Sequence, residues 1–495
     1  MDLGNVASLS LFYPEIVLAG TILLLTILDL VVANKRAMAY LGLAGCLIAL
    51  GATVDLYGME PTLLFHRMVA LDNFSLFFKV VTLAALVGAI WMSIGSGEVR
   101  QVHLGEYYIV LLTCGFGMFF MASANNLLMA YLGLELVSLT SYILTGMLPH
   151  NRRSAEAALK YLIYGGVASG TMIYGMSWVF GMAGSLDYAA INAAMAEGGG
   201  GNQVALFMAF VFILAGFGYK MAFAPFHMWS PDVYQGAPTP FTGFLSVASN
   251  AAGVAILIRF FYPAVSTLGQ EGFWAFQAFP ALQWTDLLVA LSIITMTWGN
   301  LSALNQRNVK RLLAYSGIAH AGYIMMGLVV LNNDGLNAML FYVVVYLIMN
   351  LGAFLVVMIV ANATGREDMD AYRGLAWRGA AFPAVCMMVF LASLTGLPPL
   401  AGFIGKFLLV AAIIEGQFYV LAVVAMINTV ISLYYYWRIV KTMFLDEPVP
   451  EDGPVAATPS AMPLLGALMV LTVVLGVYWA PLLDYTTGSL GFFMP

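Results

Sequence analysis

Charged residues are scarce in this sequence, and their scarcity excludes whole classes of protein. Only 9% of its 495 residues are Asp, Glu, Lys or Arg, whereas soluble domains carry about 25%. A water-soluble globule is therefore excluded. The net charge of -6 is scattered along the chain, with no block of Lys or Arg that would form a nucleic-acid-binding surface.

Cysteine is also scarce. Cys46, Cys114 and Cys386 each lie inside an apolar run, without the CxxC or Cys/His spacing that a zinc ion or an iron–sulfur cluster requires. We interpret them as small core residues. The first ten residues contain no Lys or Arg, so the basic region of a cleaved signal peptide is missing. The first apolar run is then expected to direct insertion into the membrane.

Long apolar runs are abundant, since 62% of the residues are hydrophobic. Runs of about twenty apolar residues are typical of transmembrane helices. We therefore predict a single all-α membrane domain with about fourteen transmembrane helices. The predicted spans are 11–33, 38–56, 72–94, 107–122, 126–147, 157–184, 203–235, 240–265, 285–303, 311–330, 337–362, 381–415, 418–440 and 461–483.

Two of these runs, 203–235 and 381–415, are too long for one simple span, and prolines interrupt both. The interrupting prolines are Pro225, Pro231, Pro398 and Pro399. Proline removes a backbone donor and displaces the carbonyl four residues earlier, which lipid does not tolerate unless protein or water rescues the freed group. We predict two broken helices that line a cavity.

The cations indicate the orientation, because cytoplasmic connections carry an excess of Lys and Arg. Odd-numbered connections hold 14 of the 19 cations: Lys35, Arg36, Arg100, Arg152, Arg153, Lys160, Arg307, Lys310, Arg311, Arg366, Arg373, Arg378, Arg438 and Lys441. Even-numbered connections hold Arg67 and, near a helix end, Arg259. This bias predicts odd connections in the cytoplasm and both termini on the opposite side.

Three charged residues lie deep in apolar runs: Glu135, Lys220 and Lys406. Such a residue costs about 2.5–3.5 kcal/mol at the bilayer centre on insertion scales. Both lysines lie in the broken helices, where transporters place ion sites. The alternatives are a structural Glu135–Lys220 ion pair, and a Lys406 that reaches toward the interface. Lys79 is interpreted as structural.

Charges of this kind suit proton transfer. A lysine beside a carboxylate stays charged, whereas a separated, buried lysine can release its proton. His227 and His320 have the side chain best suited to relaying protons near neutral pH. The alternative for each is a hydrogen-bonded packing residue. Lys160 follows Glu156 by four residues, so an ordinary surface pair is the alternative to a functional role.

Two segments resemble a known family. APFHMWSPDVYQGAPTPFTGFLS at 224–246 and NQRNVKRLLAYSGIAHAGY at 305–323 resemble the antiporter-like subunits of respiratory complex I, the NADH:quinone oxidoreductase. PDVYQGAPTP and the lysine of GFIGKF resemble its subunit N branch, since subunit M usually has a glutamate at Lys406. The Mrp-type Na⁺/H⁺ antiporters are more distant relatives. The resemblance covers essentially the whole chain.

The resemblance implies two inverted five-helix repeats, at 107–265 and 285–440, after N-terminal helices within 1–106 and before a last helix at 461–483. It also implies a proton path in which Glu135 pairs with Lys220, His320 relays protons and Lys406 serves one mouth. Lys160 matches a family position of moderate importance. Asn250 stands where relatives often have lysine or histidine. Because asparagine cannot carry a proton, either water bridges this step or the central relay is weaker than in relatives.

The implied function is a proton-translocating membrane-arm subunit in a bacterial inner membrane, bound to other membrane-arm subunits, including the other antiporter-like ones. NADH, FMN, iron–sulfur clusters and quinone are expected in other subunits of the complex, with no cofactor in this chain. The alternatives are an Mrp-type antiporter subunit and a structural scaffold. An antiporter would favour a carboxylate-rich cation site, of which the sequence has little beyond Glu135.

Overall fold

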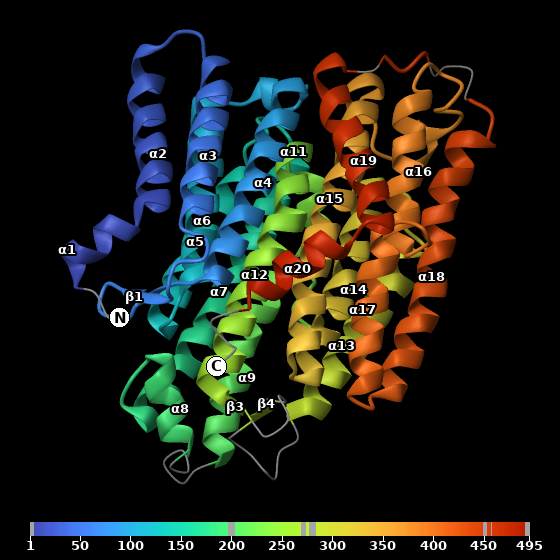
Figure 1. The fold of residues 1–495 in the computed structure, drawn as a ribbon. Helices are drawn as coiled ribbons and strands as arrows, with labels where there is room; N and C mark the ends of the chain where they lie inside the picture. Colours follow the sequence, from blue (N-terminus) through green and yellow to red (C-terminus); the bar gives the residue numbers. More distant parts are fainter. Residues whose placement is uncertain are drawn as a thin grey trace.

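Long helices packed side by side make up most of the molecule (Figure 1). This computed structural model describes residues 4–196, 203–268, 274–276, 284–448, 453–456 and 458–490. Within these ranges, twelve helices are long and apolar enough to cross a membrane. Helix α7 (Arg152–Ala183), which begins with charged residues, and the interrupted pair α16 (Ala381–Thr395) and α17 (Ala401–Glu415) add two further spans. The predicted all-α membrane fold with about fourteen spans is confirmed.

The spans follow the predicted order, with ends shifted by a few residues. Besides those just named they are α2 (Tyr13–Val31), α3 (Ala37–Asp55), α4 (Asn73–Gly95), α5 (Leu104–Ser123), α6 (Leu127–Thr145), α9 (Gln203–Met221) with α10 (Ser230–Gly236), α11 (Thr239–Phe244) with η4 (Leu245–Ser249), α12 (Asn250–Phe260) and η5 (Phe261–Val265), α13 (Trp284–Ala303), α14 (Val309–Val330), α15 (Asn333–Thr364), α18 (Tyr419–Phe444) and α19 (Met462–Val477).

Short elements connect the spans. They are α1 (Asn5–Ser8), η1 (Leu9–Leu11), η2 (Val99–Gln101), α8 (Tyr188–Ala196), η7 (Met369–Tyr372), η8 (Pro459–Ala461) and α20 (Ala480–Gly488), with the antiparallel hairpins β1 (Thr62–Leu64) with β2 (Val69–Leu71) and β3 (Ser266–Leu268) with β4 (Trp274–Phe276). Thr62 pairs with Leu71, and Ser266 with Phe276. Helices α8 and α20 were not predicted, since each is shorter than a span.

Asx side chains start several spans, which explains where the apolar runs become helical. Asp72 accepts a hydrogen bond from Ser75 N, and Ser75 Oγ accepts one from Asp72 N, so the pair forms a capping box on α4. Asn126, Asn151 and Asn308 cap α6, α7 and α14 by accepting hydrogen bonds from backbone N–H groups of the first turn. Each side chain satisfies backbone donors that the first helical turn leaves free.

Both predicted helix breaks are present. Helix α9 ends at Met221, Ala222 adopts a left-handed conformation with φ of 54°, and α10 starts nine residues after Met221, at Ser230. Pro231 lies in the first turn of α10, where a missing N–H costs nothing. It therefore starts the second half rather than interrupting the helix as predicted, and Pro225 lies in the break itself.

The second break separates α16 from α17. Helix α16 ends at Thr395, and Gly396 follows with φ of 93°, the left-handed region that glycine occupies without strain. Pro398 and Pro399 lie between the two halves, as predicted. Helix α19 packs closely on this break, because a Cβ atom at Gly476 would lie 2.1 Å from Pro399 O.

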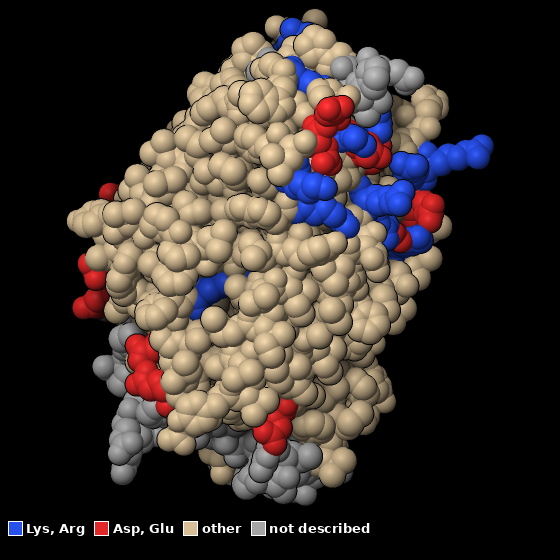
Figure 2. Space-filling view, turned by 90° about the vertical axis from the view of Figure 1, so that its right-hand side faces the viewer, with Lys and Arg blue, Asp and Glu red and all other residues tan. Residues whose placement is uncertain are grey.

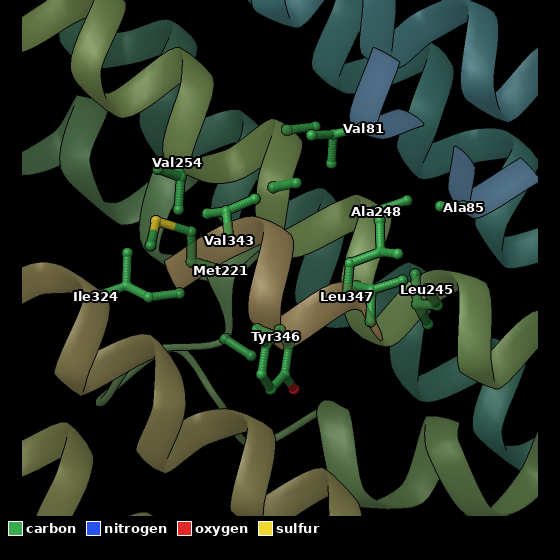
Figure 3. Close-up of a cluster of buried hydrophobic side chains, with 14 of the residues drawn as sticks. Val81, Ala85, Met221, Leu245, Ala248, Val254, Ile324, Val343, Tyr346 and Leu347 are labelled. Atoms are coloured by element: carbon green, nitrogen blue, oxygen red, sulfur yellow. The ribbon is translucent and has the colours of Figure 1, made fainter. Parts of the chain in front are cut away.

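A large apolar core joins the two halves of the bundle. Figure 3 shows Met221 from α9, Val254 from α12, Ile324 from α14 and Val343 from α15 pointing into one cluster. All are buried. Close apolar packing thus holds α9, α12, α14 and α15 together. It fixes where the polar side chains among these helices can lie.

One buried ion pair joins two of the N-terminal helices, and a second ties them to the rest of the bundle. Lys79 on α4 pairs with Glu15 on α2 at 2.5 Å, and both side chains are 2% exposed. Arg259 on α12 pairs with Asp72 and also donates to Ala122 O. The contact with Glu15 supports the structural interpretation of Lys79.

Lys and Arg gather at one end of the molecule. Figure 2 shows them near the top of one face, mixed with Asp and Glu, while the lower end of that face shows acidic residues and no Lys or Arg. The band between is almost free of charge, apart from a patch of Lys or Arg surface in a hollow. We refer to the end that carries the odd-numbered connections as the Lys/Arg-rich end.

Candidate functional site: a row of buried protonatable groups

Lys220 is the next-to-last residue of α9, immediately before the first break. The residue is 1% exposed, and no described residue gives its Nζ a hydrogen-bond partner. Cys114 on α5 and Glu135 on α6 lie within electrostatic range of it. Glu135 Oε1 is likewise buried and without a partner. The structure brings the two charges near one another but not into an ion pair among the described residues, so the predicted contact is not formed here.

Aromatic side chains complete the end of α9. Trp229 Nε1 donates to Tyr219 O at 3.0 Å, which satisfies one of the last carbonyls of the helix. The Trp229 ring stacks on Tyr161 at 4.3 Å, and the Tyr219 hydroxyl donates to Tyr161 O. The tryptophan of the break thus holds α9 against α7, which keeps the neighbouring Lys220 in place.

His227 lies inside the first break and is 3% exposed. Neither ring nitrogen has a hydrogen-bond partner among the described residues, and the ring lies 5.6 Å from that of Trp298 on α13. No described protein group therefore gives the imidazole the hydrogen bonds of the packing residue that was the alternative. It remains a candidate for proton transfer.

Lys160 lies at the Lys/Arg-rich end and is 39% exposed. It pairs with Glu156 at 2.7 Å, as the spacing indicates, and with Asp232 at 2.6 Å. Asp232 also pairs with Arg311. These charges join α7, α10 and α14. Lys160 is therefore part of an ion-pair network on α10, the half of the first broken helix that lies beyond the break.

Asn250, at the start of α12, belongs to a buried polar cluster. Its amide donates to Ser246 O at 2.9 Å and lies within hydrogen-bonding reach of Tyr346. Asn350 on α15 donates to Ser246 Oγ at 2.8 Å and to the Tyr346 hydroxyl at 3.1 Å. Asn350 Oδ1 keeps no partner among the described residues. This cluster lies where η4 and the first residue of α12 face α15.

His320 on α14 continues the polar groups into the second half of the bundle. Its Nδ1 and the Tyr342 hydroxyl are hydrogen-bonded at 2.6 Å, and its Nε2 and the Tyr436 hydroxyl at 3.2 Å. Tyr436 is in turn bonded to Ser316 Oγ. The ring centroids of His320 and Tyr346 lie 5.1 Å apart. His320 thus adjoins the Asn250 cluster through Tyr346.

Lys406 on α17 lies at the second break and is 7% exposed. Its Nζ donates to Thr395 O at 3.0 Å, a carbonyl at the end of α16 that the break leaves free. The ammonium lies 4.4 Å from the centre of the Tyr323 ring, a favourable cation–π arrangement. Lys406 contacts the break backbone, as predicted, and does not extend to the interface.

Several residues of this row were missed from the sequence. Asn350 stands in the middle of the apolar run 337–362, and a buried amide there was a usable signal, because a polar group is costly in lipid without a partner. Tyr342, Tyr346 and Tyr436 gave no such signal, since tyrosine is common in apolar runs. Their role depends on contacts between helices.

The arrangement is suited to moving protons. Lysine, histidine and tyrosine can each hold or pass a proton, and serine and asparagine can hold hydrogen-bonded water. No group of His, Cys, Asp and Glu in the described ranges could hold a metal ion.

The comparisons with known proteins agree with this arrangement. Residues 124–432 match the family described as NADH:quinone oxidoreductase/Mrp antiporter, transmembrane. The chain is 43% identical to NADH-quinone oxidoreductase subunit N of Anaeromyxobacter sp. (strain Fw109-5), across 99% of this chain and 98% of that protein.

Solved structures resemble it as well. A chain of respiratory complex I from Thermus thermophilus with bound aureothin matches with a TM-score of 0.78 and 31% identity, covering 95% of this chain and 98% of that one. A chain of the Mrp complex from Dietzia sp. DQ12-45-1b matches with a TM-score of 0.81 and 20% identity, over 97% of both chains. The second likeness shows a shared fold only.

Proposed function

Because the chain belongs to the NADH:quinone oxidoreductase/Mrp antiporter membrane family, and within it to the subunit N branch, we propose that it is a proton-translocating membrane-arm subunit of an NADH:quinone oxidoreductase. The observation that carries the proposal is the row of buried protonatable groups. The row comprises Lys220 at one helix break, the Asn250 cluster, His320, and Lys406 at the other break. His320 adjoins the Asn250 cluster through Tyr346 and Lys406 through Tyr323.

The buried groups differ in how they can take part. Lys220 has no partner and Glu135 lies near it, so a small approach of the two would favour the charged lysine, and their separation would favour release of its proton. His320 sits between two tyrosine hydroxyls, and Lys406 holds a backbone carbonyl. The polar groups of the Asn250 cluster, on the Tyr346 side of His320, would bind a bridging water. His227 lies in the segment of the first break itself. Lys160 pairs with Asp232 on α10, the helix that follows this break.

The order of the elements supports the proposed two repeats. Helices α5, α6, α7, α9 with α10, and α11 with α12 form one series of five spans whose fourth is broken. Helices α13, α14, α15, α16 with α17, and α18 form a second such series. The corresponding repeats are 107–265 and 285–440, after helices within 1–106 and before the helix at 461–483. Each repeat contributes one lysine at its break.

The cation bias supports a bacterial inner membrane protein with the Lys/Arg-rich end in the cytoplasm and both termini on the periplasmic side. Cysteine labelling tests this orientation in intact cells. We expect an impermeant thiol reagent to modify Glu60→Cys, in the exposed second connection, and not Arg152→Cys, in the fifth. Strong labelling of Arg152→Cys from outside would contradict the orientation.

The partners are other membrane-arm subunits, the other antiporter-like ones among them. NADH, FMN, iron–sulfur clusters and quinone would be bound in other subunits of the complex. Quinone reduction in those subunits would drive the movement of protons through this chain. The lipid bilayer covers the exposed apolar faces of the outer helices.

Ion dependence in vesicles separates this function from Na⁺/H⁺ exchange. We expect the complex, reconstituted with NADH and a soluble quinone, to move protons at the same rate with and without Na⁺. Proton movement that needs a Na⁺ gradient and no NADH would contradict the proposal and favour an Mrp-type antiporter. NADH oxidation and proton transport that both persist in a complex lacking the chain would contradict any role in translocation.

A further inference from the structure

A polar cavity of about 760 Å³ opens at the Lys/Arg-rich end. It lies where the third, fifth, seventh, ninth and eleventh connections meet, so it is shared by both proposed repeats. Its lining includes Glu98, Arg153, Gln235, Arg307 and Glu367. The mixed charges of this lining would hold water readily.

A fully buried lysine lies directly beneath the cavity. Lys310, in the first turn of α14, is 0% exposed, and its Nζ donates to Glu367 Oε1 at 2.9 Å. Glu98 lies within electrostatic range on the other side. The buried Lys310 ammonium is thus paired with one carboxylate that lines the cavity, that of Glu367, and has a second, Glu98, nearby. A buried charge that loses its partner is costly.

The same lysine contacts the first broken helix. Lys310 Nζ donates to Ala237 O at 2.8 Å, in the turn that joins α10 to α11. Two residues on, the Thr239 N–H donates to Glu98 Oε2 at 2.7 Å. Thr239 is 0% exposed, and its hydroxyl has no hydrogen-bond partner among the described residues. A buried hydroxyl of this kind, beside a cavity-lining carboxylate, is a place where water would bind.

Below Lys310 the polar row begins. Gly317 lies seven residues further along α14, about 10 Å deeper into the bundle. A Cβ atom there would lie 3.1 Å from the Tyr346 hydroxyl and 3.9 Å from the Tyr234 hydroxyl. Tyr346 is the residue that bonds Asn350 and adjoins His320. Lys310 therefore stands between the cavity and the central groups.

We propose that this cavity is the mouth through which water from the Lys/Arg-rich end reaches the polar row. Lys310, bonded to Glu367 and to the Ala237 carbonyl, is then the positioning residue that separates the cavity from the row. The inference rests on the proposed function. When the Lys310 contacts loosen, water from the cavity passes the Thr239 hydroxyl toward Tyr234 and Tyr346. Opening and closing would then follow movement of the α10–α11 turn.

Substitution of Lys310 is the first test, with Lys79 as the matched control. Both are buried lysines paired with a carboxylate, but Lys79 lies far from the cavity, on α4 against α2. In the assembled complex we expect Lys310→Met to lose most NADH-driven proton transport, Lys310→Arg to retain most of it, and Lys79→Met to keep transport per assembled complex. Equal transport in Lys310→Met and Lys79→Met would overturn the proposal.

Blocking the mouth after assembly avoids any folding defect. Gln235 lines the cavity, and the three native cysteines are buried. In inside-out vesicles we expect a negatively charged methanethiosulfonate reagent to label Gln235→Cys and to lower transport, while labelled Arg36→Cys, exposed at the same end, transports normally. If Gln235→Cys were not labelled, or were labelled without loss of transport, the proposal that this cavity is the entrance for water would be wrong. Normal transport by Lys220→Met and Lys406→Met would instead overturn the proposed function.

Discussion

The two helix breaks place a lysine in opposite situations. At the second break, Lys406 donates to the Thr395 carbonyl and lies over the Tyr323 ring. At the first break, Lys220 Nζ has no hydrogen-bond partner among the described residues, and Trp229 occupies the carbonyl of Tyr219 instead. A proline break with a nearby lysine therefore gives a lysine fixed to the backbone in one repeat and one free to respond to Glu135 in the other.

The largest expected difference between the two breaks is in how much a glycine-to-alanine substitution destabilises the subunit. A Cβ atom at Gly402 would lie 1.8 Å from the Ser393 backbone oxygen, whereas one at Gly218 would meet the Phe223 and Phe226 rings at 2.4 Å and 2.8 Å. Since rings can turn and backbone cannot, we expect Gly402→Ala to destabilise the subunit by about 1–3 kcal/mol or more and Gly218→Ala by less.

The temperature at which the subunit leaves the detergent-solubilised complex measures this difference. Gly170→Ala on α7 is the control, because no atom lies within 4 Å of its added Cβ. If Gly218→Ala proved the more damaging of the two, the second break would not be the more tightly packed.

Removing the lysines should sharpen the contrast. Lys220→Met and Lys406→Met both remove a buried charge, but only the second leaves a carbonyl, that of Thr395, without its donor. A buried acceptor that loses its partner costs about 1–3 kcal/mol. We therefore expect Lys406→Met to be the less stable variant by that amount in the same dissociation assay. Equal stabilities would mean that the Thr395 contact contributes nothing.

The smallest expected effect concerns the aromatic ring under Lys406. Tyr323→Leu removes the ring and with it a cation–π contact of about 0.5–2 kcal/mol. Tyr323→Phe keeps the ring and loses the hydroxyl bonds to Ala425 O and Thr429. We expect Tyr323→Leu to be less stable than Tyr323→Phe. In a Lys406→Met background, we expect the difference in stability between these two variants to be smaller. If the difference in stability were the same with and without Lys406, the cation–π contact would contribute nothing to stability.

The sequence was sufficient for the spans, the two breaks and the deep charges, because each depends on local chemistry. Apolar runs form helices, and prolines break them by removing a backbone donor. Lys406 lies near the carbonyls that such a break leaves free and donates a hydrogen bond to one of them, Thr395 O. Contacts between distant segments were not predictable. Asp232, which joins Lys160 to Arg311, and Glu367, which holds Lys310, lie on separate helices or loops whose packing the sequence does not state.

The separation of Glu135 from Lys220 was also beyond sequence analysis. A carboxylate and a lysine in neighbouring spans predict an ion pair, but helix packing decides whether their side chains meet. Here the aromatic groups Tyr161, Tyr219 and Trp229 fix the end of α9. The same limit applies to Asn250, whose partners Ser246 and Asn350 became evident only where α12 meets α15.

The most direct measurement of the account is proton transport per NADH oxidised, in vesicles holding the assembled complex with Lys220→Met, Lys406→Met or Lys79→Met. Lys79 is the control, since it is buried and ion-paired but outside the row. The account predicts that the first two variants lose most of their transport while Lys79→Met retains it. Normal transport by Lys220→Met and Lys406→Met would contradict the claim that the buried row carries the protons.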